Sequence, residues 1–150
     1  MSNTARDSRP PSTAWKTALT VLQEAVPPVI PVGGHAMTVV VDFPPGDPGT
    51  PPHRHSGPAF GYVVEGEMLF ELEGERARVV RAGEAFWEPG GDVMHYQDGN
   101  NRDDCPLRFT VTMFCVPGQP MLTLVEETEL EARRERRAVS NADASNPESH

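Results

Sequence analysis

Glycine and proline interrupt this chain every few residues, and this rhythm limits the fold more than any other feature. The sequence holds 13 glycines and 16 prolines, and all the glycines and most of the prolines fall between residues 27 and 118. Paired glycines and prolines favour turns and leave only short segments between them. The middle of the chain is therefore expected to consist of short strands joined by turns.

The segments between these turns are rich in β-branched and aromatic residues, as strands are. The predicted strands are 37–43, 61–65, 68–72, 76–81, 84–88, 107–116 and 121–125. In 107–116 the apolar residues alternate and so share one face: Leu107, Phe109, Val111, Met113 and Cys115. A hairpin turn is expected at Glu65-Gly66-Glu67, and a second turn at Glu73-Gly74-Glu75. This pattern predicts an all-β sandwich or barrel.

The two ends differ from the middle in composition. Residues 1–13 are polar and are expected to form a flexible arm, and residues 14–126 to form a single domain. Residues 127–150 are expected to form a short C-terminal helix and a disordered tail. The helix start is predicted at Thr128, because Thr128-Glu129-Leu130-Glu131 fits a capping box.

Charge and cysteine content exclude some classes of function. A net charge of −9 argues against nucleic acid and anionic membranes as partners, because a protein that binds either of them needs a cationic surface. No apolar run approaches the roughly 18 residues that a membrane span needs, and no signal peptide is recognised. Cys105 and Cys115 form no CxxC pair, which favours a cytoplasmic location. A single disulfide between them is the alternative.

Histidines give the strongest functional signal. His53 and His55 stand two residues apart directly after Pro51-Pro52, and His95 follows about forty residues later. In an extended backbone, residues i and i+2 lie on one face. Two imidazoles would then point into one space, where His95 from another strand would complete a metal site.

The order of these residues resembles the cupin superfamily. Its first motif, G(x)5HxH(x)3-4E(x)6G, corresponds to PPHRHSGPAFGYVVEGE, which begins at residue 51. Its second motif, G(x)5PxG(x)2H(x)3N, corresponds to GEAFWEPGGDVMH, which begins at residue 83. The resemblance covers residues 37–116 and implies a double-stranded β-helix, or jelly-roll barrel. It also implies a divalent metal ion, which would be iron, zinc, nickel or manganese.

The chain departs from these motifs at several positions. Ala59 stands where the first motif has its glutamate, so three neutral ligands are expected: His53, His55 and His95. His95 lies one residue later than the second motif places it, which predicts a bulge or a wider loop. Gln97 is a candidate for an additional ligand. A metal held by imidazoles alone would be a stronger Lewis acid and a better host for an anionic substrate.

Residues around this site are candidates for a substrate pocket, and the candidates are Ala59, Tyr62, Tyr96, Phe109 and Met113. Ala59 would enlarge the pocket, and either tyrosine would offer a hydroxyl to the substrate. Glu84 and Glu88 are expected to be exposed to solvent, with a hydrogen bond to a histidine as the alternative.

Three hypotheses for the function follow. The first is a small metal-dependent cupin enzyme, of the oxygenase type, that acts on a small organic molecule. The second is a non-catalytic small-ligand-binding or sensor cupin, with or without metal. The third is a metal-free barrel that serves dimerisation. A homodimer is expected in any case, with residues 18–26 as a candidate pairing strand.

Overall fold

The computed structural model describes residues 16–138, and the regular secondary structure in this range is β-strand apart from one short α-helix and a 3-10 turn. The strands are β1 (His35–Phe43), β2 (His53–Arg54), β3 (Ala59–Glu65), β4 (Glu67–Leu72), β5 (Arg78–Arg81), β6 (Ala85–Glu88), β7 (His95–Gln97), β8 (Leu107–Cys115) and β9 (Thr123–Leu124). The α-helix α1 (Glu127–Arg133) is followed by a 3-10 turn at Arg134–Arg136. The predicted all-β class with a short C-terminal helix is confirmed.

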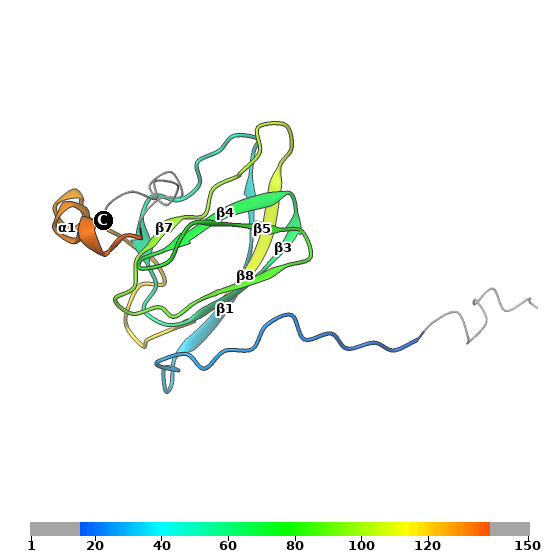
Figure 1. The fold of residues 1–150 in the computed structure, drawn as a ribbon. Coiled ribbons are helices and arrows are strands. Elements are labelled where there is room, and N and C mark those ends of the chain that lie inside the picture. Colours follow the sequence, from blue (N-terminus) through cyan, green and yellow to red (C-terminus); the bar gives the residue numbers. More distant parts are fainter. Residues whose placement is uncertain (1–15, 139–150) are drawn as a thin grey trace, which may run out of the picture.

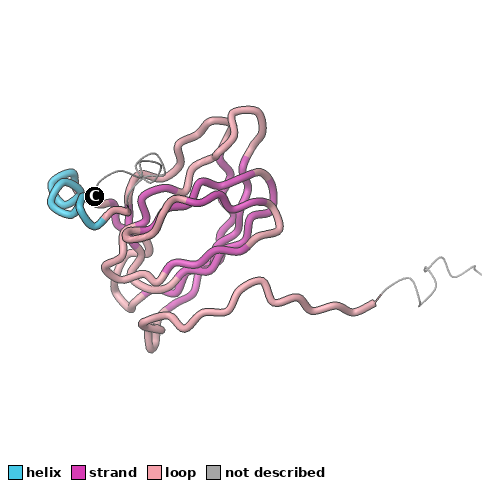
Figure 2. The backbone as a smooth tube through the Cα atoms, in the orientation of Figure 1, coloured by secondary structure: helices cyan, strands magenta, loops and turns pink. Residues whose placement is uncertain are grey.

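Two antiparallel sheets form the body of the molecule (Figure 1). One has the strand order β1-β8-β3-β6, and the other has the order β5-β4-β7-β2-β9. The strands ring a common interior, which is seen end-on in the tube drawing (Figure 2). The order of strands interleaves distant parts of the chain, so that β2 pairs with both β7 and β9. This interleaving brings the histidine segments together.

The first predicted turn is a corner between the two sheets and not a hairpin. β3 pairs with β6 and β8, whereas β4 pairs with β5 and β7, so the chain changes sheets at Gly66. Gly66 has a φ of 81°, and a Cβ atom there would lie 2.4 Å from the carbonyl oxygen of Pro106. The second predicted turn is a true hairpin turn, because it joins the paired strands β4 and β5.

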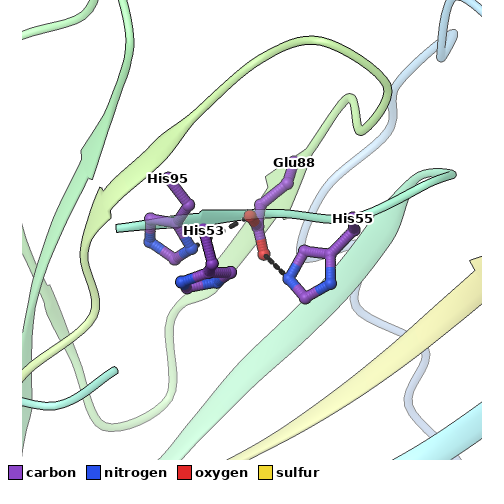
Figure 3. Close-up of side chains that lie close together, drawn as sticks. All are labelled: His53, His55, Glu88 and His95. Carbon is purple, nitrogen blue, oxygen red and sulfur yellow. Dashed lines mark ion pairs between the residues drawn. The ribbon is translucent and has the colours of Figure 1, made fainter. Parts of the chain in front are cut away.

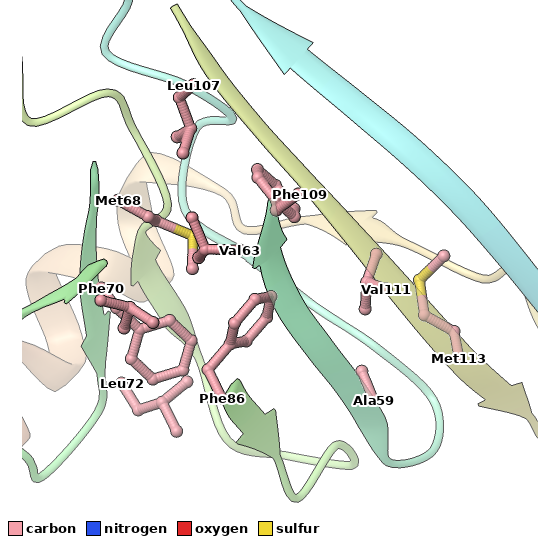
Figure 4. Packing of buried hydrophobic residues seen from close by; sticks show 11 residues of the cluster. Ala59, Val63, Met68, Phe70, Leu72, Phe86, Leu107, Phe109, Val111 and Met113 are labelled. Carbon is pink, nitrogen blue, oxygen red and sulfur yellow. The ribbon is translucent and has the colours of Figure 1, made fainter. Parts of the chain in front are cut away.

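The interior holds a cluster of buried apolar side chains from both sheets (Figure 4). The predicted alternation in β8 is confirmed, with every second residue buried from Leu107 to Cys115. The rings of Phe70 and Phe86 pack with their centroids 5.3 Å apart. Gly61 leaves room for the second ring, since a Cβ atom there would lie 2.0 Å from Phe86 Cζ. The glycine is therefore needed for this packing.

Two strands were too short to be expected from the sequence, and the helix begins earlier than predicted. β2 has two residues and β7 has three. The N-cap of α1 is Glu126 and not Thr128, and no side chain caps it. The helix is attached to the barrel by Arg133, which pairs with Glu73 and with Asp92. The capping-box pattern therefore predicted the presence of the helix but placed its start two residues late.

The segment before β1 runs along the outside of the barrel without regular secondary structure (Figure 1). Residues 18–26 therefore form no strand within this chain, and Leu19 and Val26 are 88% and 93% exposed. The predicted arm at 1–13 and most of the predicted tail lie outside the described residues. No helix in the described part of the chain is long and apolar enough to cross a membrane. Cys105 and Cys115 are both free.

Candidate metal centre

The three histidines of the predicted site meet inside the barrel. His53 lies in β2 directly opposite His95 of β7, and His55 follows two residues later on the same side. All three side chains are buried. The ring centroid of His53 lies 5.0 Å from that of His55 and 4.9 Å from that of His95. The spacing argument thus placed all three rings correctly, although their role as ligands stays a prediction.

A fourth side chain, Glu88, lies among the three rings (Figure 3). Each of the four residues offers one ligand atom, and these atoms all lie within 4.8 Å of one another. Glu88 Oε1 lies 2.9 Å from His95 Nδ1, and Glu88 Oε2 lies 3.4 Å from His55 Nε2. The expectation that Glu88 would be exposed is wrong. It shares the inner face of β6 with Phe86, because the two residues stand at positions i and i+2 of the strand.

Strand pairing explains why Ala59 is accompanied by Glu88. In the register of β3 and β6, Ala59 stands directly opposite Glu88. Opposed residues have Cβ atoms roughly 5 Å apart, so a carboxylate at 88 reaches the region that a glutamate at 59 would serve. The candidate site therefore contains three imidazoles and one carboxylate, and not only the three neutral groups that were expected.

Backbone carbonyls orient two of the rings. His53 Nδ1 lies 2.9 Å from the carbonyl oxygen of Pro51, and His55 Nδ1 lies 2.8 Å from that of Met121. A nitrogen that donates to a carbonyl carries the proton, so in the neutral ring the lone pair lies on Nε2. Both rings thus present an Nε2 acceptor, as metal-binding histidines do.

His95 has no such carbonyl partner. Both of its ring nitrogens are buried; Nδ1 lies 2.9 Å from Glu88 Oε1, and Nε2 has no hydrogen-bond partner within the described residues. Buried polar atoms without a partner are rare in native proteins. A divalent cation among these four side chains would supply the missing partner, so the residues present fit a metal ion.

The cluster is electrostatically coupled. Burial favours a higher pKa for Glu88, but the adjacent His95 and His55 rings outweigh it and hold the pKa well below its usual value. Burial and the neighbouring His95 lower the pKa of His53. For His55, burial favours a lower pKa, but the hydrogen bond to Glu88 outweighs it and raises the pKa. Glu88 is therefore an anion at neutral pH, and a divalent metal here would keep one net positive charge.

A cavity of about 160 Å³ opens beside the four side chains. Its wall is mostly apolar, and it includes Val39, Val41, Met68, Phe86, Phe109, Val111, Met113 and Leu122. Phe109 and Met113 were predicted for this pocket and do line it. Apart from the cluster, its polar residues are Thr50 and Asp98. This composition is typical of a small-molecule site.

Three other pocket predictions are corrected. Tyr62 is 37% exposed on the outer face of β3, opposite to Val63, which points inward. Tyr96 lies under Arg137, whose guanidinium is 4.5 Å from the ring centroid, and does not line the cavity. Ala59 is fully buried in the apolar core and leaves space for Glu88 instead of enlarging the pocket.

Gln97 also points away from the histidines. Its amide donates a 2.6 Å hydrogen bond to Glu71, which in turn pairs with Arg137. The register between β4 and β7 shifts between Glu71 and Leu72, so the alternation that begins at His95 is broken there. Gln97 therefore belongs to the outer face with Glu71, and its prediction as a ligand is corrected.

The sequence family agrees with this geometry. Residues 39–117 match the Cupin domain family, which covers more than half of the chain. The chain is a cupin. Its two sheets are the double-stranded β-helix that the sequence motifs implied. A search of curated proteins found no match.

Several solved structures are similar to this cupin. A recombinant oxalate oxidase in complex with glycolate is 28% identical to this cupin at a TM-score of 0.50; the match covers 66% of this chain and 56% of that one. KdgF from Halomonas sp. is 36% identical at a TM-score of 0.41, over 51% and 67% of the two chains. A cupin-like protein from Thermotoga maritima is 20% identical at 0.50, over 68% and 73%. This cupin spans about half the length of the oxalate oxidase chains it matches.

Sequence reasoning did not place two carboxylates in this cavity, although a hydrogen bond between Glu88 and a histidine was the alternative to its expected exposure. Glu88 could have been placed from alternation, because Phe86 was expected in the core and Glu88 lies two residues further along the same strand. Asp98 had a weaker signal. It follows the short strand β7, which the sequence did not predict, so nothing fixed the direction of its side chain.

Proposed function

We propose that this cupin binds one divalent metal ion through His53, His55, His95 and Glu88 and acts on a small organic molecule as an oxygenase-type enzyme. The observation that carries the proposal is the buried His95 ring, whose Nε2 has no hydrogen-bond partner among the described residues and whose Nδ1 lies 2.9 Å from an anionic carboxylate. Imidazole and carboxylate together suit iron, manganese, zinc or nickel. When bound, the metal would supply Lewis acidity and open coordination positions.

The residues of the chain would hold the metal and bury the substrate. His53 and His55 are held by backbone carbonyls and would keep the metal in a fixed place. The apolar wall, with Val111 and Leu122 on it, would exclude water and bury the substrate. A similar oxalate oxidase is in complex with glycolate, a small hydroxy acid, which supports a small-molecule ligand for this cupin.

A non-catalytic ligand-binding or sensor role is the alternative. It is favoured by the small number of polar residues in the cavity wall, which has only Thr50 and Asp98 besides the three histidines and Glu88. A homodimer in the cytoplasm stays part of the proposal. The exposed apolar side chains of Leu19 and Val26 support dimerisation, since burying them in a partner would be favourable.

The experiment that tests this proposal measures metal in untagged protein by mass spectrometry. We expect about one metal ion per chain in the wild type and in His35→Ala, which removes an exposed histidine of β1. His53→Ala should hold less than a tenth of that amount and keep its far-ultraviolet circular dichroism. Light scattering on the same samples should give a mass of two chains.

Three further measurements decide between the alternatives: oxygen consumption, ligand-dependent thermal stability and metal uptake. Oxygen consumption on small hydroxylated or carboxylic substrates by the iron-loaded protein would support an oxygenase. Ligand-dependent thermal stabilisation without any product would support the sensor role. A wild-type protein that takes up no metal even after reconstitution would contradict the metal-dependent enzyme and leave a metal-free sensor or a metal-free dimerisation barrel.

A further inference from the structure

Asp98 lies in the wall of the same cavity as the three histidines and Glu88, but it is not one of the four side chains that could hold a metal. Its side chain is buried, with 6% exposed. Oδ1 accepts a 2.7 Å hydrogen bond from the backbone N–H of Thr50, and Oδ2 accepts a 2.8 Å bond from the Thr50 hydroxyl. Among residues 16–138, no arginine, lysine or histidine nitrogen lies within 4.0 Å of it, since no ion pair includes Asp98. Its charge is therefore balanced by two neutral donors only.

A buried carboxylate in this position can accept more hydrogen bonds than it receives. An ionised carboxylate offers about four acceptor positions, and Thr50 uses two of them. Burying a charge is unfavourable unless donors or counter-charges compensate it. A ligand that enters the cavity and carries a hydroxyl or amino group would provide a further donor to Asp98.

The loop before β2 is built closely around this carboxylate. Gly49 has a φ of 80°, and a Cβ atom at this position would lie 2.3 Å from Asp98 Oδ1. Gly99 packs equally closely, because a Cβ atom there would lie 2.4 Å from the carbonyl oxygen of Pro48. Two glycines thus allow the backbone to approach Asp98 from one side, which leaves the cavity side for a ligand.

We propose that Asp98 is a specificity-determining residue that selects small ligands with a metal-binding anionic group and a neighbouring hydroxyl, and that it rejects dianions. This inference rests on the proposed metal site. A divalent metal, Glu88 and Asp98 together leave the cavity without net charge. A dicarboxylate would add two negative charges beside Asp98 in an apolar site, whereas a hydroxylated monocarboxylate adds one and donates its hydroxyl to Asp98.

The size of the cavity fits ligands of this kind. A volume of about 160 Å³ is close to the roughly 150 Å³ of an engineered apolar cavity that accepts benzene. A ligand of about six non-hydrogen atoms would therefore fill it. Glycolate and similar hydroxy acids meet this limit, and they carry both required groups.

Calorimetry on zinc-loaded protein tests the inference, because zinc is redox-inert. The probes are glycolate, acetate and oxalate, titrated into the wild type, Asp98→Asn and Asp103→Asn. We expect Asp98→Asn to reduce the preference for glycolate over acetate about tenfold, the usual effect of losing one charge-assisted hydrogen bond. The same variant should bind oxalate about tenfold more tightly than the wild type.

Asp103→Asn is the matched control, since it makes the same change at an exposed position that does not line the cavity. Its preference for glycolate over acetate should stay within twofold of the wild type. If Asp103→Asn shifts the preference as much as Asp98→Asn, the effect comes from the change in net charge and the inference is overturned. Should Asp98→Asn fail to fold, Asp98→Ser removes the same charge and replaces it in the comparison.

Zinc content, measured first in every variant, separates the two proposals. If the wild type and Asp98→Asn both hold one zinc ion but share the same preferences among the three probes, the inference fails and the metal site stands. If the wild type holds no zinc, the metal site fails and this inference fails with it. Equal zinc content together with a tenfold change in preference supports both.

Discussion

The barrel interior has two ends of different character, a packed end around Phe70 and a hollow end around Glu88. Around Phe70 the interior is filled by buried apolar side chains such as Val63 and Leu72. Around Glu88 it holds buried polar side chains and a cavity. The boundary is sharp, because the Phe70 ring centroid lies only 4.8 Å from that of His95.

The two ends differ in what they contribute to the free energy of unfolding. Burying apolar side chains stabilises the fold by about 1.5–3 kcal/mol for each large residue. Burying a carboxylate and three imidazoles is unfavourable until a counter-charge or ligand compensates it. The apolar packing at one end therefore stabilises the fold, and it offsets the unfavourable burial of Glu88 and the three histidines at the other end.

The largest effect on stability is expected at the packed end. Phe70→Ala should lower the free energy of unfolding by about 3–5 kcal/mol, because it removes a fully buried ring and leaves a cavity. Urea denaturation measures this loss. Val40→Ala, at an exposed position of β1, is the control and should change stability by less than about 0.5 kcal/mol. A loss below about 1 kcal/mol for Phe70→Ala would contradict the contrast between the two ends.

At the hollow end the largest effect should fall on metal affinity. Glu88→Gln removes the negative charge of the proposed carboxylate ligand but keeps the shape of the side chain, so metal affinity should fall by roughly a hundredfold. Competition with a chromogenic chelator measures the change. Glu84→Gln is the matched control, because Glu84 stands just before β6 but is exposed. Equal affinities in wild type and Glu88→Gln would show that the carboxylate is not a ligand.

A smaller effect is expected when volume is added at each end. Val63→Leu adds a methylene where no space is left and should lower the free energy of unfolding by about 1–3 kcal/mol. Val111→Leu adds the same group into the cavity wall and should change it by less than about 1 kcal/mol. Thermal unfolding of both variants gives the comparison. Equal losses at the two positions would mean that the cavity end is as tightly packed as the other.

Much of the fold could be predicted, because alternation and turn residues are local signals. β8 shows this best, since its inward residues from Leu107 to Cys115 follow from periodicity alone. The convergence of His53, His55 and His95 also followed from spacing and motif order. The hairpin expected at Gly66 failed because a turn residue does not reveal which sheet the next strand joins.

The positions of the remaining site residues depend on strand pairing and register, which the sequence does not reveal. Glu88 enters the site through its register with Ala59, which is a contact between residues 29 positions apart. Tyr96 follows an inward His95 and should have been assigned outward by alternation. Gln97 breaks that same rule because of the register shift between β4 and β7, which no local pattern announces.

The pairing of Ala59 with Glu88 has a consequence for how proteins of this fold are recognised. A coordinating acid can move to the facing strand while its location in space is nearly unchanged, so its distance along the chain from the histidines is not fixed. Pattern searches that demand the acid at one interval would discard such chains as inert barrels. The residue across the strand pair should be inspected before a chain is set aside in this way, since one substitution on each strand is enough to exchange the two arrangements.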